Sequence, residues 1–167
     1  MNDPGKNPYA PPQQGYAPVS PSTVETGIVE RQALQLAGVF LLAGAALNAI
    51  ALLKFNTTLV RMTYSSRWFS VGFDVYIGGS LLAGRYGKRW WAMVRAILGA
   101  MLVGFPALVR GATADGALVV ASCAAIALLV APKPTPRRVT AAAVLYGVTF
   151  LVMLVVFARA AMTMRHT

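Results

Sequence analysis

Residues 68–110 decide the fold, and they read WFSVGFDVYIGGSLLAGRYGKRWWAMVRAILGAMLVGFPALVR. Two apolar segments in this stretch are separated by the short basic sequence GRYGKRWW at residues 84–91. A basic turn between two apolar segments of this length predicts a helical hairpin that crosses a membrane and turns at its surface. The segments also carry the two charges that lie deepest in apolar sequence, Asp74 and Arg95.

The whole chain has the composition of a membrane protein. Of its 167 residues, 57% are hydrophobic and 12% are charged, whereas a soluble protein carries about 25% charged residues. The net charge is +10, but the cations stand singly or in small groups at the ends of apolar segments. This placement indicates membrane topology and contact with the lipid bilayer, and it argues against nucleic acid as a partner.

Residues 1–22 form a polar tail rich in Pro, Tyr and Gln. This composition cannot bury a core, and it predicts a disordered segment with a preference for polyproline II structure. A solvated leader is the simplest interpretation. The alternative is a docking peptide for a cytoplasmic partner, because Tyr9 and Tyr16 both stand in the sequence Tyr-Ala-Pro and Pro-rich segments bind aromatic grooves.

The stretch Asn7-Pro-Tyr-Ala-Pro-Pro12 resembles the leaders of small bacterial multi-pass membrane proteins, including some members of the RDD family. The Arg-Asp-Asp signature of that family does not occur in this sequence. The resemblance therefore implies a class of protein, located in a bacterial inner membrane, and it implies no activity and no site residue.

The rest of the chain, residues 23–167, is predicted to be one all-α transmembrane domain. Ser22 and Glu25 match a capping box, which places the start of the first helix there. We expect a bundle of about five transmembrane helices, with four as the alternative, and a kink or helix end at Pro106. The expected spans are residues 32–53, 65–84, 90–109, 114–131 and 139–158.

The orientation follows from the cations. The compact basic clusters at residues 85–89 and 133–138 fall on the same side of the membrane in either orientation of a five-span chain. Basic residues on short loops are enriched on the cytoplasmic side, which favours a cytoplasmic N-terminus.

Small residues at helical spacing predict where the helices pack, because they let two backbones approach closely. The clearest series occurs every four residues in the third expected span. The predicted packing positions are Ala37, Gly44 and Ala51, Gly79 and Ala83, and Ala92, Ala96, Ala100 and Gly104.

Three polar residues within the expected spans are candidates for a site: Asp74, Arg95 and Asn48. Asp74 is the one that packing explains least, because a carboxylate in hydrocarbon must be paired, neutral or close to water. Counted from the turn at 85–89, Asp74 lies about 16 Å deep and Arg95 about 9 Å deep. We therefore expect Arg95 to extend to headgroups and Asp74 to hydrogen-bond near the other interface. Asn48 is interpreted as a packing amide, and the three residues form the candidate polar site.

The sequence predicts neither an enzyme nor a cofactor or metal site. Its one cysteine, Cys123, lies in an apolar segment, and its one histidine, His166, lies near the C-terminus. The sequence favours a structural or accessory subunit that packs against a membrane-protein partner or a second copy. A small transporter or channel subunit that uses Asp74 is the alternative. An interfacial anchor, or alternatively a lipid headgroup site, is predicted at Arg85, Lys88, Arg89, Trp90 and Trp91.

Overall fold

The computed structural model describes residues 21–54 and 61–163, with side chains for residues 27–53 and 68–159 and for Met162. The described chain is helical, which confirms the predicted all-α class. Most of the predicted tail, residues 1–22, and the side chains of the predicted capping box lie outside the described residues. The elements are α1 (Pro21–Lys54), α2 (Arg61–Leu82), the 3₁₀ turn η2 (Tyr86–Lys88), α3 (Arg89–Gly99), the π-helical turn η3 (Ala100–Gly104), α4 (Phe105–Val109), α5 (Thr113–Val130) and α6 (Pro136–Thr163).

Four of the described helical segments are long and apolar enough to cross a bilayer, so the chain is a multi-pass membrane protein. α2 has 22 residues, about 33 Å of helix, and its sequence is less apolar than those of α1, α5 and α6. The described residues thus form five long helical units. The four segments are Gly27–Leu53, Tyr86–Val109, Thr113–Val130 and Pro136–Arg159.

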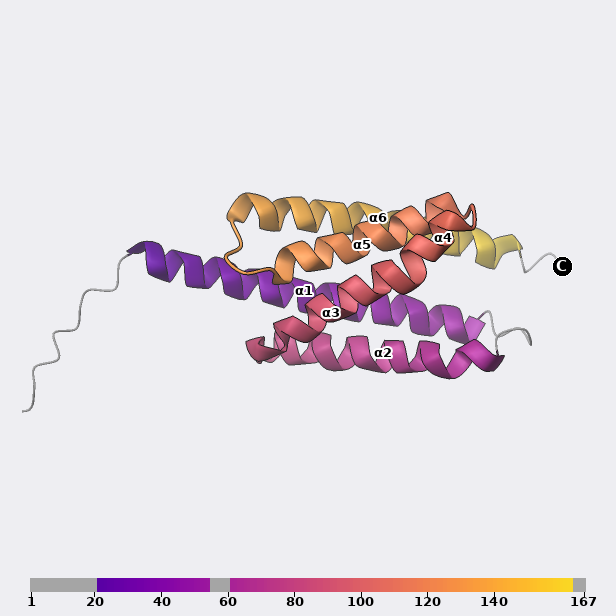
Figure 1. Cartoon of the computed structure of the whole chain (residues 1–167), viewed down its shortest axis with the longest axis horizontal. Coiled ribbons are helices and arrows are strands. Elements are labelled where there is room, and N and C mark those ends of the chain that lie inside the picture. The colour runs from indigo at the N-terminus through magenta and orange to yellow at the C-terminus, as the bar shows by residue number, and fades with distance from the viewer. Residues whose placement is uncertain (1–20, 55–60, 164–167) are drawn as a thin grey trace, which may run out of the picture.

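The helices form two antiparallel pairs joined by a diagonal helix (Figure 1). α2 packs along α1, and α6 packs along α5. The continuous unit of α3, η3 and α4 crosses from the end of α2 to the start of α5. The α2–α3 turn and the α5–α6 connector therefore lie at the same end of the bundle as the N-terminal part of α1. We call this the basic end, because it carries Arg31, Arg85, Lys88, Arg89, Lys133, Arg137 and Arg138.

Two glycines explain how short turns reverse the chain. Gly84 ends α2 with a φ of +78°, and Gly111 follows α4 with a φ of +83°, a backbone conformation that disfavours side chains. The amide after each glycine donates to the carbonyl five residues earlier: Arg85 to Ser80 at 2.9 Å, and Ala112 to Ala107 at 3.0 Å. These are Schellman motifs, which satisfy the last carbonyls of a helix while turning the chain.

α1 and α2 cross at a contact between two glycines. A Cβ on Gly38 would lie 2.8 Å from the carbonyl oxygen of Gly78, and a Cβ on Gly78 would lie 2.8 Å from that of Gly38. Neither position has room for a side chain, so glycine at both allows the two backbones to touch. The fully buried Ile77 and Leu81 of α2 fill the core beside this crossing.

The π-helical turn η3 sets which residues of the diagonal helix face α5. The amide of Phe105 donates to the carbonyl of Ala100, five residues back, immediately before Pro106, which has no amide hydrogen to donate. The extra residue in this turn moves Gly104 onto the buried face. There its carbonyl oxygen would lie 2.8 Å from a Cβ on Gly116 of α5. At Pro106, where a kink or helix end was expected, the structure has a π turn just before the proline, and the helix continues to Val109.

Candidate functional site

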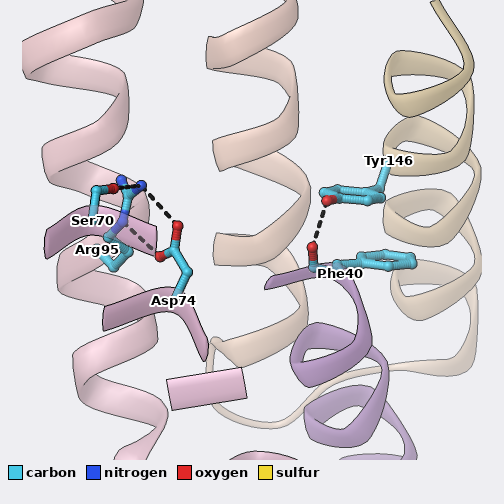
Figure 2. A network of polar contacts seen from close by, with 5 residues as sticks. All are labelled: Phe40, Ser70, Asp74, Arg95 and Tyr146. Carbon is cyan, nitrogen blue, oxygen red and sulfur yellow. Dashed lines mark hydrogen bonds and ion pairs between the residues drawn. The ribbon is translucent and has the colours of Figure 1, made fainter. Parts of the chain in front are cut away.

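The candidate site is an ion pair between α2 and α3, and we call Asp74, Arg95 and Ser70 the α2–α3 polar cluster (Figure 2). Arg95 Nε donates to Asp74 Oδ1 at 2.7 Å, and Arg95 Nη2 donates to Asp74 Oδ2 at 3.0 Å. The same Nη2 also donates to Ser70 Oγ at 2.7 Å. The side chain of Asp74 is 7% exposed and that of Arg95 is 24% exposed. Both carboxylate oxygens therefore accept charge-assisted hydrogen bonds in a largely buried setting.

The expectation that Asp74 and Arg95 lie apart is wrong. The expected depths of the two residues were counted from a turn at residues 85–89. The chain has already reversed its direction at Arg85, and the 3₁₀ turn η2 leads directly into α3. A 3₁₀ turn rises about 2 Å per residue, so Arg95 lies about 15 Å from the start of η2. Asp74 lies about 12 Å from the end of α2. The Arg95 side chain leans back toward its own N-terminus and closes the difference.

Gly99 provides the space for the guanidinium group. A Cβ at this position would lie 2.8 Å from Arg95 Nη1 and 3.0 Å from Cys123 Sγ on α5. The absence of a side chain lets α5 approach α3 while Arg95 turns toward α2. Cys123 is a free, half-buried thiol at this contact. Gly99, one turn after Arg95, is therefore a positioning residue of the cluster.

A second polar contact joins α1 to α6 (Figure 2). The hydroxyl of Tyr146 donates to the carbonyl oxygen of Phe40 at 2.5 Å, and the two rings stack with centroids 3.9 Å apart and planes 5° apart. A Cβ on Gly44 would lie 3.3 Å from the tyrosine oxygen, so glycine there makes room for the hydroxyl. α5 and α6 are linked by a hydrogen bond from Ser122 Oγ to Thr149 Oγ1 at 3.2 Å.

The third predicted polar residue does not join the cluster. Asn48 lies on an exposed part of α1, one turn beyond Gly44. Among the described residues, no hydrogen bond joins its side chain to the ion pair or to Tyr146. The predicted site residues that the structure brings together are Asp74 and Arg95.

The predicted packing residues divide into buried and exposed groups. Ala37, Ala92, Ala96 and Gly104 are buried, Gly44 contacts Tyr146, and Ala51 and Ala100 are half-buried. Gly79 and Ala83 are exposed, and no atom lies within 4 Å of where a Cβ on Gly79 would be. The α1 contact of α2 instead runs through Gly78, one residue away and therefore about 100° around the helix.

The basic end holds a shallow concave site of about 370 Å³, lined by Arg85, Tyr86, Gly87, Lys88 and Trp91. Arg89 turns away from it and forms an ion pair with Glu30 of α1 at 2.6 Å. Trp90 lies beside Arg89 and the start of the α5–α6 connector, in a separate small depression. The five residues predicted as one interfacial group thus face two different directions.

Several residues that build these contacts were not singled out from sequence. Ser70 had a signal, because it precedes Asp74 by one helical turn and therefore shares its face. Gly38, Gly78, Gly99 and Gly116 had none beyond being glycines in apolar segments. Tyr146 had no signal either, because its partner is a backbone carbonyl, which a sequence pattern cannot reveal.

No family model, curated protein or solved structure matches the chain.

Proposed function

We propose that the chain is a structural or accessory subunit of a membrane complex, without catalytic activity of its own. The observation that carries this proposal is the closed α2–α3 polar cluster. Both oxygens of the Asp74 carboxylate accept hydrogen bonds from Arg95. The one deep carboxylate of the described chain is thereby engaged in holding two helices together, which is the common use of polar groups between membrane helices.

The outer face of α2 is the surface that this subunit offers to a partner. Gly72, Gly79 and Ala83 are exposed there, and no atom lies within 4 Å of where a Cβ on either glycine would be. Small residues on an exposed face let another helix approach closely. The sequence of α2 is also less apolar than those of α1, α5 and α6, so a protein partner is a better neighbour for it than lipid. The partner is a helix of another membrane protein or of a second copy.

A matched pair of glycine substitutions tests the proposal. Gly79→Leu places a bulky side chain on the outer face of α2, and Gly147→Leu does the same on α6, where likewise no atom lies within 4 Å of a Cβ. Both variants of the full chain are purified in mild detergent, and particle mass and co-purifying proteins are measured. We expect Gly79→Leu to lose the partner or dissociate the oligomer, and Gly147→Leu to behave as the natural chain. Equal behaviour of the two variants would refute the assignment of this face.

A small transporter or channel subunit is the second candidate. The observation that favours it is the partial exposure of Arg95, whose side chain is 24% exposed while that of its partner is 7% exposed. A carboxylate whose counter-ion faces outward is suited to exchange that counter-ion for a proton or a cation. Asp74→Asn in proteoliposomes separates the two functions. Loss of a proton-linked flux, with the protein level and particle mass unchanged, would favour transport.

We also propose a bacterial inner membrane location with the basic end in the cytoplasm. Glu30 is the described acidic residue at that end, and it is paired with Arg89. The other cations of the basic end lie on or beside short loops, which is where basic residues are enriched on the cytoplasmic side of a membrane. A reporter fused after Thr167 should then be active on the periplasmic side, and activity on the cytoplasmic side alone would contradict this orientation.

A further inference from the structure

The concave site at the basic end has two cations that no described acidic side chain pairs with. Arg85 and Lys88 line it, and the described acidic residues nearest along the bundle, Glu30 and Asp74, are engaged by Arg89 and Arg95. Among the described side chains, no carboxylate therefore neutralises Arg85 or Lys88. The site carries two positive charges in a hollow of about 370 Å³.

The surrounding chain holds the Lys88 ammonium group and the Arg85 backbone. The Nζ atom of Lys88 lies 5.3 Å from the ring centroid of Tyr76 on α2, a cation–π contact that holds the ammonium group against that helix. Arg85 follows directly on the Schellman motif at Gly84, so its backbone is fixed by the hydrogen bond to Ser80. A guanidinium and an ammonium placed together match the anionic oxygens of a phosphate group.

An aromatic surface leads from this site along the seam between α2 and α3. Trp91 lines the site and meets Phe73 edge to face, with centroids 6.1 Å apart and planes 88° apart. Phe73 in turn stacks on Phe69 with centroids 6.1 Å apart. Trp91 is 53% exposed and Phe69 is 75% exposed, so this aromatic surface faces the membrane. It continues from the basic end toward the middle of the bundle, at the level of Ser70.

We propose that this site binds the headgroup of an anionic phospholipid. Its phosphate lies between Arg85 and Lys88, and one acyl chain lies along Trp91, Phe73 and Phe69. A free phosphate ion would use only the two cations, whereas a phospholipid uses the cations and the aromatic surface together. Tyr76, which contacts Lys88, lies one helical turn from both Gly72 and Gly79, so the lipid site borders the face of α2 that is proposed for the partner. The lipid proposal rests on the two cations and the aromatic rings and not on that partner.

Lipid binding is measured on the full chain by native mass spectrometry after addition of phosphatidylglycerol or phosphatidylcholine. The test variant is Arg85→Gln with Lys88→Gln. The matched control is Arg137→Gln with Lys133→Gln, which removes the same two charges from the exposed α5–α6 connector and the first turn of α6, at the same end. We expect the test variant to weaken phosphatidylglycerol binding about 30-fold, at roughly fivefold for each basic side chain, and the control to weaken it less than about threefold.

Three results would overturn the proposal. They are equal binding of the two lipids by the natural chain, equal loss of binding in the two double variants, and inorganic phosphate binding as tightly as phosphatidylglycerol. Trp91→Ala supplies a second criterion that leaves the charges unchanged. It should weaken phosphatidylglycerol binding while leaving any inorganic phosphate binding unaltered, because the ring contacts the acyl chain. An unchanged lipid affinity in this variant would rule out the aromatic surface as part of the site.

Discussion

Replacing Gly78 with alanine probes the contact that holds α1 against α2. The added Cβ would lie 2.8 Å from the carbonyl oxygen of Gly38 and 3.1 Å from Leu42 Cγ. The next residue, Gly79, provides the control, because a Cβ there would meet no atom within 4 Å. The two substitutions are identical in chemistry and adjacent in sequence, so they differ only in the face of α2 that they alter.

The expected free energies follow from two opposing effects. Alanine in place of glycine within a helix stabilises the helix by about 1 kcal/mol, and at Gly79 this effect acts alone. At Gly78 the new methyl group meets a backbone carbonyl that cannot rotate away, so the two helices must separate. Overpacking of this kind costs about 1–3 kcal/mol. Gly78→Ala should therefore be less stable than Gly79→Ala by about 1–3 kcal/mol, and no more stable than the natural chain.

Equilibrium unfolding of the full chain in mixed micelles, with increasing sodium dodecyl sulfate, measures both stabilities under the same conditions. Gly38→Ala should repeat the result of Gly78→Ala, because the contact is reciprocal. Equal stability of Gly78→Ala and Gly79→Ala would refute the close crossing of α1 and α2.

The same unfolding assay checks three further contacts. Asp74→Asn and Arg95→Gln should each destabilise the chain by about 2–4 kcal/mol, because each leaves one charge unpaired. The double variant leaves no unpaired charge, so its loss of stability should be at least about 1 kcal/mol smaller than the sum of the two single losses. Strictly additive losses would argue against a direct pair. Tyr146→Phe removes the hydrogen bond to Phe40 but keeps the ring stack, so a loss of about 1 kcal/mol is expected, and a loss beyond about 3 kcal/mol would mean that the hydroxyl does more than this. Glu30→Gln should change stability by less than about 1 kcal/mol, since the paired side chains of Arg89 and Glu30 are 30% and 38% exposed, and a larger effect would contradict a surface pair.

The ion pair shows where counting along a sequence is insufficient. Asp74 and Arg95 were identified as the deep charges from their positions alone, because a charge within an apolar segment is visible in the sequence. Whether they meet depends on where the chain reverses and on the rise of the turn. The Schellman motif at Gly84 and the 3₁₀ turn after it place the two residues at one level. That geometry depends on the backbone conformation of the turn. A depth calculated from the number of residues, with the same rise for each, does not take that conformation into account.

The packing faces show the same limit. A four-residue series correctly placed Ala92 and Ala96 in the interior, because a regular helix repeats its faces every 3.6 residues. Gly99, and not Ala100, takes the next buried position, and the π turn at Ala100–Gly104 makes the following step five residues long, so Gly104 of the same series is buried as well. On α2 the choice between Gly78 and Gly79 depended on which side α1 occupies. Two adjacent glycines carry no information about that side.

The sequence by itself determined that this chain is a helical membrane protein with a basic turn between two hairpin helices. Hydrophobicity over a bilayer's thickness and the placement of cations are local properties, so they can be read residue by residue. The tertiary structure alone decided which glycines touch and that Asp74 pairs with Arg95. It also decided that Arg89 pairs with Glu30 and does not line the concave site at the basic end. These contacts join residues far apart in the chain. Their existence depends on crossing angles and helix phase, which only the packed bundle fixes.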